Sequence, residues 1–253
     1  MAEFLAGAQV SAGVMRAQAL VADSGAGESA KLVDLGQALV KLLATVGTLV
    51  AEWSWTELIV RAGWLPHASI PLELVFEAQD IADTDQRLTG HFRSDWAAIS
   101  ESLRASVAAA VADSNACDAF VQSLRAHDLG MYRVAPVLLF PHVERLARAK
   151  LLPGAQGASP AVPLQMAVGE LGPSQFTMAG VSGLRLYQKL AEHLYKQVRT
   201  ADEIAAAQAD PVPNRNAALH GRVDYASEKS SLNMMIMADF IFDALSKVPP
   251  APR

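Results

Sequence analysis

The chain has 253 residues, of which 51% are hydrophobic and 19% charged, with a net charge of −5 and a pI of about 5.7. These values are typical of a globular protein with a sizeable core, and they exclude a disordered chain. Because the net charge is negative, any nucleic acid has to be held by a local basic patch. The single cysteine, Cys117, excludes an intramolecular disulfide framework and a cysteine-rich zinc site, and it fits a reducing cytoplasm.

No segment predicts a secretory signal or a membrane span. The N-terminal segment has Glu3 early and lacks a basic region ahead of its apolar residues. The most apolar stretch, residues 32–53, is interrupted by Asp34 and Lys41, whereas a span needs about 20 uncharged residues. We therefore expect a cytoplasmic protein without a membrane partner.

Apolar residues recur at helical spacing along the chain, and no alternating strand pattern is found, so we expect an all-α fold. Residues 31–62 carry one long apolar stripe, which Gly63 ends. A shorter helix is expected from Pro71, because proline is favoured in the first helical turn. One or two further helices are expected over residues 91–125.

The second half continues the helical pattern. Residues 131–151 predict a helix with breaks at Pro136 and Pro141, because proline removes a backbone N–H. Residues 153–183 are rich in Gly, Pro and Ser and predict a long loop, either functional or a dispensable surface loop. An amphipathic helix follows over residues 184–198, with four residues facing inward: Leu186, Leu190, Leu194 and Val198. No internal repeat is visible.

The closing segment, PNRNAALHGRVDYASEKSSLNMMIMADFIFDAL, places Arg215, Asn216 and His220 just before a nearly all-apolar helix. Pro211 or Pro213 is expected to fix the start of a short helix, and Gly221 to end it after His220. Ser227 is the expected N-cap of the final helix.

On an ideal helix, Asn216 and His220 share a face, while Arg215 lies about 140° round from His220. Arg215 must therefore reach round from a frayed first turn, or two copies of the motif must face each other.

These three residue types suit phosphodiester chemistry. A histidine moves protons near neutral pH, a guanidinium binds phosphate oxygens in a planar fork, and an amide orients either. The structural alternative is a helix end in which the arginine pairs with an acid and the histidine caps carbonyl groups.

The string Arg215-Asn216-Ala217-Ala218-Leu219-His220-Gly221, followed by an apolar C-terminal helix, resembles the R-N-x-x-x-H signature of the HEPN superfamily. The resemblance covers about the last half of the chain. In it, residues 134–148 resemble the first long helix of the HEPN bundle, with Glu144 and Arg148 as polar positions. It implies a HEPN-like helical domain over residues 125–253, preceded by a helical N-terminal region over residues 1–124.

By the same resemblance, Arg215 and His220 are the expected catalytic pair of a metal-independent endoribonuclease, and Asn216 the polar residue beside them. The family dimerises so that two motifs line one cleft, which removes the 140° difficulty. The RNA 2′-hydroxyl would attack the adjacent phosphorus, with His220 as general acid or base and Arg215 stabilising the charge. The products would be a 2′,3′-cyclic phosphate and a 5′-hydroxyl.

The resemblance implies a bacterial defence, toxin–antitoxin or stress system, with RNA as substrate, a homodimer, and an antitoxin or regulatory protein as a further partner. No metal and no cofactor is expected, because no acidic cluster of metal-ligand spacing occurs in the segment. Two other functions remain open: a non-catalytic module that binds RNA, nucleotide or protein, and a purely structural dimerisation domain.

Other chemistry-bearing residues are interpreted as structural. His67 is expected at the surface of a turn, and His91, His127 and His193 in surface or capping positions. His142 is a minor candidate for a helix start facing the cleft. The tryptophans are expected in the core rather than as an RNA-stacking platform; they are Trp53, Trp55, Trp64 and Trp96.

Overall fold

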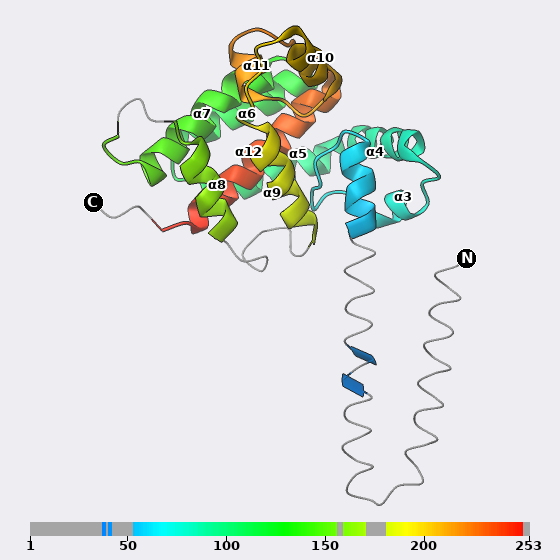
Figure 1. The fold of residues 1–253 in the computed structure, drawn as a ribbon. Coiled ribbons are helices and arrows are strands. Elements are labelled where there is room, and N and C mark those ends of the chain that lie inside the picture. The colour runs from blue at the N-terminus through cyan, green and yellow to red at the C-terminus, as the bar shows by residue number, and fades with distance from the viewer. Residues whose placement is uncertain (1–36, 39, 42–52, 156–158, 171–180, 250–253) are drawn as a thin grey trace, which may run out of the picture. The chain divides into compact units, whose positions relative to one another are not determined.

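The computed structural model describes most of the chain from residue 53 onward, together with a few earlier residues; the ranges are 37–38, 40–41, 53–155, 159–170 and 181–249. Every regular element in these ranges is a helix and no strand occurs in them, which confirms the all-α fold (Figure 1). None of the described helices is long and apolar enough to cross a membrane. Helices α3 to α12 all belong to one compact unit, which begins at residue 53.

This unit opens with a helix over residues 53–61, which stops at Gly63 as its sequence predicted. Gly63 has a φ of 78°, and its N–H bonds to the carbonyl of Val60 at 2.9 Å, while that of Trp64 bonds to the carbonyl of Ile59 at 3.0 Å. This pair of bonds is a Schellman cap, which needs a residue in the left-handed conformation. A Cβ at Gly63 would also lie 2.6 Å from Cγ of Pro211, so two constraints require glycine here.

Four helices follow. They are α3 (Leu72–Phe76), α4 (Ile81–Ser94), α5 (Trp96–Ala110) and α6 (Ser114–Asp128). Pro71 precedes α3 as expected. Helices α5 and α6 pack against each other, and the carboxylate of Asp113 caps α6 by accepting the N–H of Ala116 at 2.9 Å. The boundary expected between residues 124 and 125 falls inside α6 and inside this compact unit.

Helix α7 (Val134–Leu151) runs without interruption, so the breaks predicted at Pro136 and Pro141 were wrong. Pro136 is the third residue of the helix, where a backbone N–H would have no intrahelical partner anyway. Pro141 lies inside the helix, and the carbonyl that it leaves unbonded belongs to Val137, which is 56% exposed. Val137 thus lies at the surface, where an unpaired backbone carbonyl costs less than in the core.

Part of the predicted loop over residues 153–183 is helical. Residues 161–170 form α8 (Ala161–Glu170), while residues 156–158 and 171–180 lie outside the described chain. Helix α9 (Val181–His193) ends five residues before the predicted end at 198. The four residues predicted to face inward are nevertheless all buried, at 1–5% exposure. The buried positions therefore continue beyond the end of α9, because Leu194 and Val198 lie in the segment that follows the helix and are still buried.

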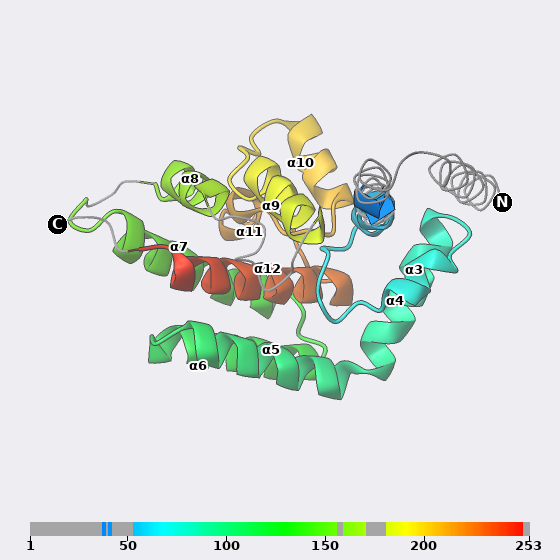
Figure 2. The same ribbon diagram turned by 90° about the horizontal axis from the view of Figure 1, so that it is seen from below.

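Three helices close the chain: α10 (Ala201–Ala209), α11 (Arg215–Leu219) and α12 (Glu228–Lys247). Ser227 caps α12 as predicted, by accepting the N–H of Ser230. Every residue of α12 from Ser230 to Leu245 is buried. Figure 2 shows the reason: α12 lies beside α7, with α5 and α6 on one side and α8 and α9 on the other.

Polar groups on α12 fasten the chain around it. Asn233 is fully buried; its Oδ1 accepts the N–H of Leu65 at 2.9 Å, and its Nδ2 donates to the carbonyl of Gly63 at 2.9 Å. One amide therefore satisfies two backbone groups of the 63–65 turn, groups that have no water to bond to.

Replacing Asn233 with alanine should lower the free energy of unfolding by about 2 to 4 kcal/mol, because two buried backbone groups lose their partner. Urea denaturation followed by circular dichroism measures the change. The matched control is Arg104→Ala on α5, which removes an exposed ion pair with Glu101 and should cost less than about 0.5 kcal/mol. Equal effects of the two substitutions would contradict the stabilising role of the hydrogen bonds between Asn233 and the 63–65 turn.

Candidate functional site

Helix α11 carries the R-N-x-x-x-H motif and is fixed at both ends. Its N-cap is Asn214, which directly follows Pro213. The side-chain oxygen of Asn214 accepts the N–H of Ala217 at 2.9 Å. His220 is the C-cap, and Gly221 follows with a φ of 62°. The predicted end of this helix is therefore confirmed, and its start is set by an asparagine cap beside the predicted prolines.

The first turn of α11 caps the C-terminal end of α9. The Nδ2 of Asn214 donates to the carbonyls of His193 and Lys196, at 2.6 and 3.0 Å. The Nδ2 of Asn216 donates to the carbonyls of Tyr195 and Lys196, at 3.1 and 3.2 Å. Carbonyls at a helix end have no intrahelical donor. Asn216 of the motif therefore has a structural task, shared with Asn214, which is only 1% exposed.

Arg215 forms an ion pair with Glu144 of α7. Its Nη2 donates to Oε2 at 2.9 Å, its Nε lies 2.7 Å from Oε1, and its Nη1 donates to Oδ1 of Asn216 at 3.0 Å. The two charged side chains are 24% and 14% exposed. The hydrogen bonds to Glu144 and Asn216 together hold the plane of the guanidinium in one orientation. The structure thus joins Arg215, Asn216 and Glu144 in one cluster.

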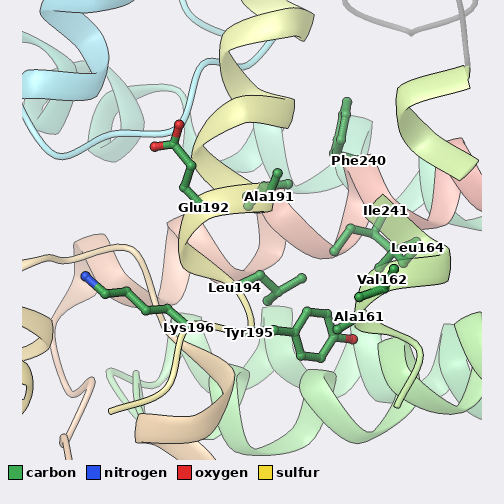
Figure 3. Close-up of a pocket in the computed structure, with 11 residues that line it drawn as sticks. Ala161, Val162, Leu164, Ala191, Glu192, Leu194, Tyr195, Lys196, Phe240 and Ile241 are labelled. Carbon is green, nitrogen blue, oxygen red and sulfur yellow. The ribbon is translucent and has the colours of Figure 1, made fainter. Parts of the chain in front are cut away.

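Tyr195 lies next to this cluster and also lines an apolar cavity of about 310 Å³ between α8, α9 and α12. In Figure 3 its ring points toward Ala161 and Val162, while the charged ends of Glu192 and Lys196 point away from the cavity. The Tyr195 hydroxyl is buried without a hydrogen-bond partner in the described chain. Burial raises the pKa of Tyr195, and the charge of Glu144 raises it further, so the phenol stays protonated near neutral pH.

His220 stands apart from the cluster. It is exposed at the far end of α11, and its backbone N–H bonds to the carbonyl of Asn216 at 3.3 Å. No hydrogen bond or ion pair in the described chain joins its imidazole to Arg215 or Glu144. A cavity of about 260 Å³ opens beside it, lined by Gly221 and by Val137 of α7 among others. Within one chain, the structure therefore presents Arg215 and His220 in different surroundings, as the helical geometry predicted.

The other histidines differ from their expected positions. His67 is not on the surface, because its side chain is only 12% exposed and lies near Asp239. His127 is buried beneath α12, with Nδ1 3.0 Å from Oγ of Ser231. His142 lies in the middle of α7, so it does not mark a helix start. His67 and His127 are drawn inward by packing between segments far apart in the sequence, which spacing along one helix does not reveal.

The tryptophans divide between core and surface. Trp64 is 1% exposed and stacks on Phe92, as a core residue should, but Trp53 is 41% exposed. In the described part of the chain, no three His, Cys, Asp or Glu side chains gather as ligands for a metal ion.

Sequence reasoning named Glu144 only as a polar position and missed Asn214. The preference of asparagine for N-caps, just before the motif, was the signal that would have found it. Comparisons with protein-family models, curated proteins and solved structures give no match to this chain.

The ion pair between Glu144 and Arg215 should contribute about 1 to 2 kcal/mol of coupling free energy, between the values for exposed and buried pairs. A double-mutant cycle with Glu144→Ala, Arg215→Ala and the combined variant measures it by urea denaturation. A coupling near zero would mean that the guanidinium is not held by Glu144 in solution.

Acid should destabilise the fold through His193. Its Nε2 donates to the carbonyl of Val212 at 2.7 Å, and burial lowers the pKa of His193 below its ordinary value of 6.5, although Asp210 opposes this. The unfolded chain therefore binds the proton first as pH falls below 6.5, and the free energy of unfolding decreases there by at most about 1.4 kcal/mol per pH unit. Well above pH 6.5 His193 is neutral in both the folded and the unfolded chain, so the free energy of unfolding no longer changes with pH through this residue.

Chemical denaturation from about pH 8 to about pH 5 tests this, because few carboxylates titrate in that range. His193→Gln should show a shallower loss than the parent protein. An unchanged slope would assign the acid sensitivity to another group.

Proposed function

We propose that this protein is a metal-independent endoribonuclease of the HEPN type. It acts in the cytoplasm as a homodimer and cleaves RNA to a 2′,3′-cyclic phosphate and a 5′-hydroxyl. The role is in bacterial defence, a toxin–antitoxin pair or a stress response, with an antitoxin or other regulatory protein as partner. The observation that carries the proposal is the arrangement of α11: Arg215 is held in one orientation by Glu144, while His220 stands exposed at the other end.

The contacts of Arg215 support a charge-stabilising role, because they orient the guanidinium without using all of its N–H donors. One N–H of Nη1 goes to Asn216 and one of Nη2 to Glu144. Each of these nitrogens carries a second N–H, and in the proposed reaction it donates to a non-bridging phosphate oxygen. An arginine fixed before substrate arrives loses less entropy on binding and is ready for the charge of the transition state.

His220 supports the acid–base role through its exposure, since a proton carrier must reach the RNA. In the proposed homodimer, the motif of a second copy of the chain would face His220. Apolar side chains near the start of α7 are exposed as a dimer face would require: Leu129 is 74%, Met131 50% and Val137 56% exposed. Val137 also lines the cavity beside Gly221, so this exposed apolar side chain lies near the end of α11.

A non-catalytic binding module is the second candidate, and one observation favours it. Arg215 and Asn216 already serve internal contacts, to Glu144 and to the carbonyls that end α9. The net charge of −5 also gives no general attraction for RNA. In that case the motif would hold the α9–α11 junction, and the homodimer would bind RNA, nucleotide or protein without cleaving it.

Purified protein should cleave total RNA in the presence of EDTA. His220→Ala should reduce the rate by at least about a hundredfold, since a general acid or base contributes that much. Arg215→Lys should recover little activity relative to Arg215→Ala, because an ammonium cannot form the planar fork. Product ends are identified by sensitivity to 2′,3′-cyclic phosphodiesterase.

The controls are His142→Ala on α7 and Arg104→Ala on α5, a histidine and an arginine outside the motif, and both should cleave at the parent rate. Cleavage that survives His220→Ala in folded protein would remove the enzymatic proposal. RNA binding without cleavage, retained in His220→Ala and lost in Arg215→Ala, would favour the binding module.

A further inference from the structure

A second cavity, with both polar and apolar residues in its lining, lies on another side of α12. It has a volume of about 220 Å³ and is enclosed by the turn over residues 67–69, α5, α9 and α12. Its polar lining comes from His67, Ser69, Ser102, Ser106 and Asp239. The apolar remainder includes Leu103, Leu186 and Phe240, all 5% exposed or less. The motif on α11 contributes nothing to this lining.

Asp239 is the unusual group in this cavity. It is 6% exposed, and its Oδ1 is buried without a hydrogen-bond partner in the described chain. Its Oδ2 lies 3.7 Å from Nε2 of His67, which is beyond hydrogen-bond distance. A desolvated carboxylate without donors is costly, so native proteins keep one where something else supplies the donor.

His67 does not supply a hydrogen-bond donor to this carboxylate in the arrangement seen. The backbone N–H of Ser69 donates to Nδ1 of His67 at 3.1 Å. A backbone N–H can only donate, so Nδ1 is the acceptor of this bond. The Oγ of Ser69, 2.7 Å from the same Nδ1, is then a donor too. His67 is thus oriented by its own turn, and it leaves Oδ1 of Asp239 without a hydrogen-bond donor.

The other buried polar groups of α12 have partners, which sets Asp239 apart. Asp243, one turn further on, pairs with Lys247 at 2.6 Å. Asn233 bonds to the 63–65 turn, and Ser231 lies 3.0 Å from His127. Burial in this helix therefore goes with satisfied hydrogen bonding except at the residue that faces the cavity.

We propose that this cavity is a binding site for a small organic cation, a compact primary amine with an apolar body. The ammonium group donates to Oδ1 of Asp239, a charge-assisted hydrogen bond that supplies the missing donor. Leu103 and Leu186 contact the body of the ligand, and the ring of Phe240 adds a π surface that favours a cation. Ser102 is exposed and Ser106 half-buried, so the entrance lies along α5.

The residue types Ser69, His67 and Asp239 also occur in hydrolase triads, but their geometry here favours binding. A triad needs a hydrogen bond between histidine and carboxylate, and the separation of 3.7 Å is too long for one. The imidazole nitrogen that faces Ser69 is already held by that residue's own backbone. The carboxylate is therefore left for a ligand.

Benzylamine and its neutral analogue benzyl alcohol test the site by isothermal titration calorimetry on the full chain. Benzylamine should bind with a Kd at least about tenfold lower than benzyl alcohol, because only the ammonium supplies a charged donor. Asp239→Asn should raise the Kd of benzylamine to that of the alcohol. Ser106→Leu, which fills the entrance from α5, should abolish binding of both compounds.

The matched control is Asp243→Asn, which removes a buried acid of the same helix that does not line the cavity and should leave the Kd within about twofold. Asp239→Asn should keep its fold, since it removes an unpaired charge. Equal binding of amine and alcohol, unchanged affinity in Asp239→Asn, or no saturable binding below about 10 mM would overturn the proposal. If Asp239→Asn does not fold, unchanged benzylamine binding in Ser106→Leu overturns it.

Discussion

The burial of α12 is the constraint on which the rest of this structure depends. Sixteen consecutive residues, Ser230 to Leu245, are buried, so the helix must be covered on every side and each of its polar groups needs a partner within the protein. Helices α7 and α5 supply much of the cover. Asn233 shows the second requirement, because its amide fastens the turn at Gly63 to the middle of the core.

The short helix α11 both stabilises its neighbouring helices and carries the residues of the proposed reaction. Its first turn caps α9 through Asn214 and Asn216, and its arginine bonds to Glu144 on α7. These contacts satisfy groups that would otherwise be unpaired, and they also fix the orientation of Arg215. A fixed arginine is useful to a ribonuclease and equally useful to a helix junction. Activity measurements, rather than contacts alone, separate the two roles.

The buried polar groups of α12 differ in whether they have hydrogen-bond partners. Asp243 and Asn233 are bonded within the chain, whereas Asp239 faces a cavity with one carboxylate oxygen unpartnered. Natural proteins tolerate such a local cost where function requires it. His67 does not remove the contrast, because its Nδ1 accepts from the backbone of Ser69 and its Nε2 lies 3.7 Å from the carboxylate of Asp239.

The sequence by itself determined the helical class and the local features that depend on neighbouring residues. Helical spacing indicated the fold, Gly63 and Gly221 ended their helices, and Ser227 capped α12. The same reasoning placed Leu186 and Leu190 in the core. These features follow from backbone conformation and periodicity, which act over a few residues.

Only the tertiary structure decided which distant residues meet. The ion pair of Glu144 with Arg215 spans 71 positions, and the approach of His67 to Asp239 joins a turn to the last helix. Local rules also failed where packing outweighed them: α7 continues through Pro141, and part of the Gly- and Pro-rich segment forms α8. The physical reason is that burial between helices depends on the path of the whole chain, and sequence spacing along one helix does not contain that path.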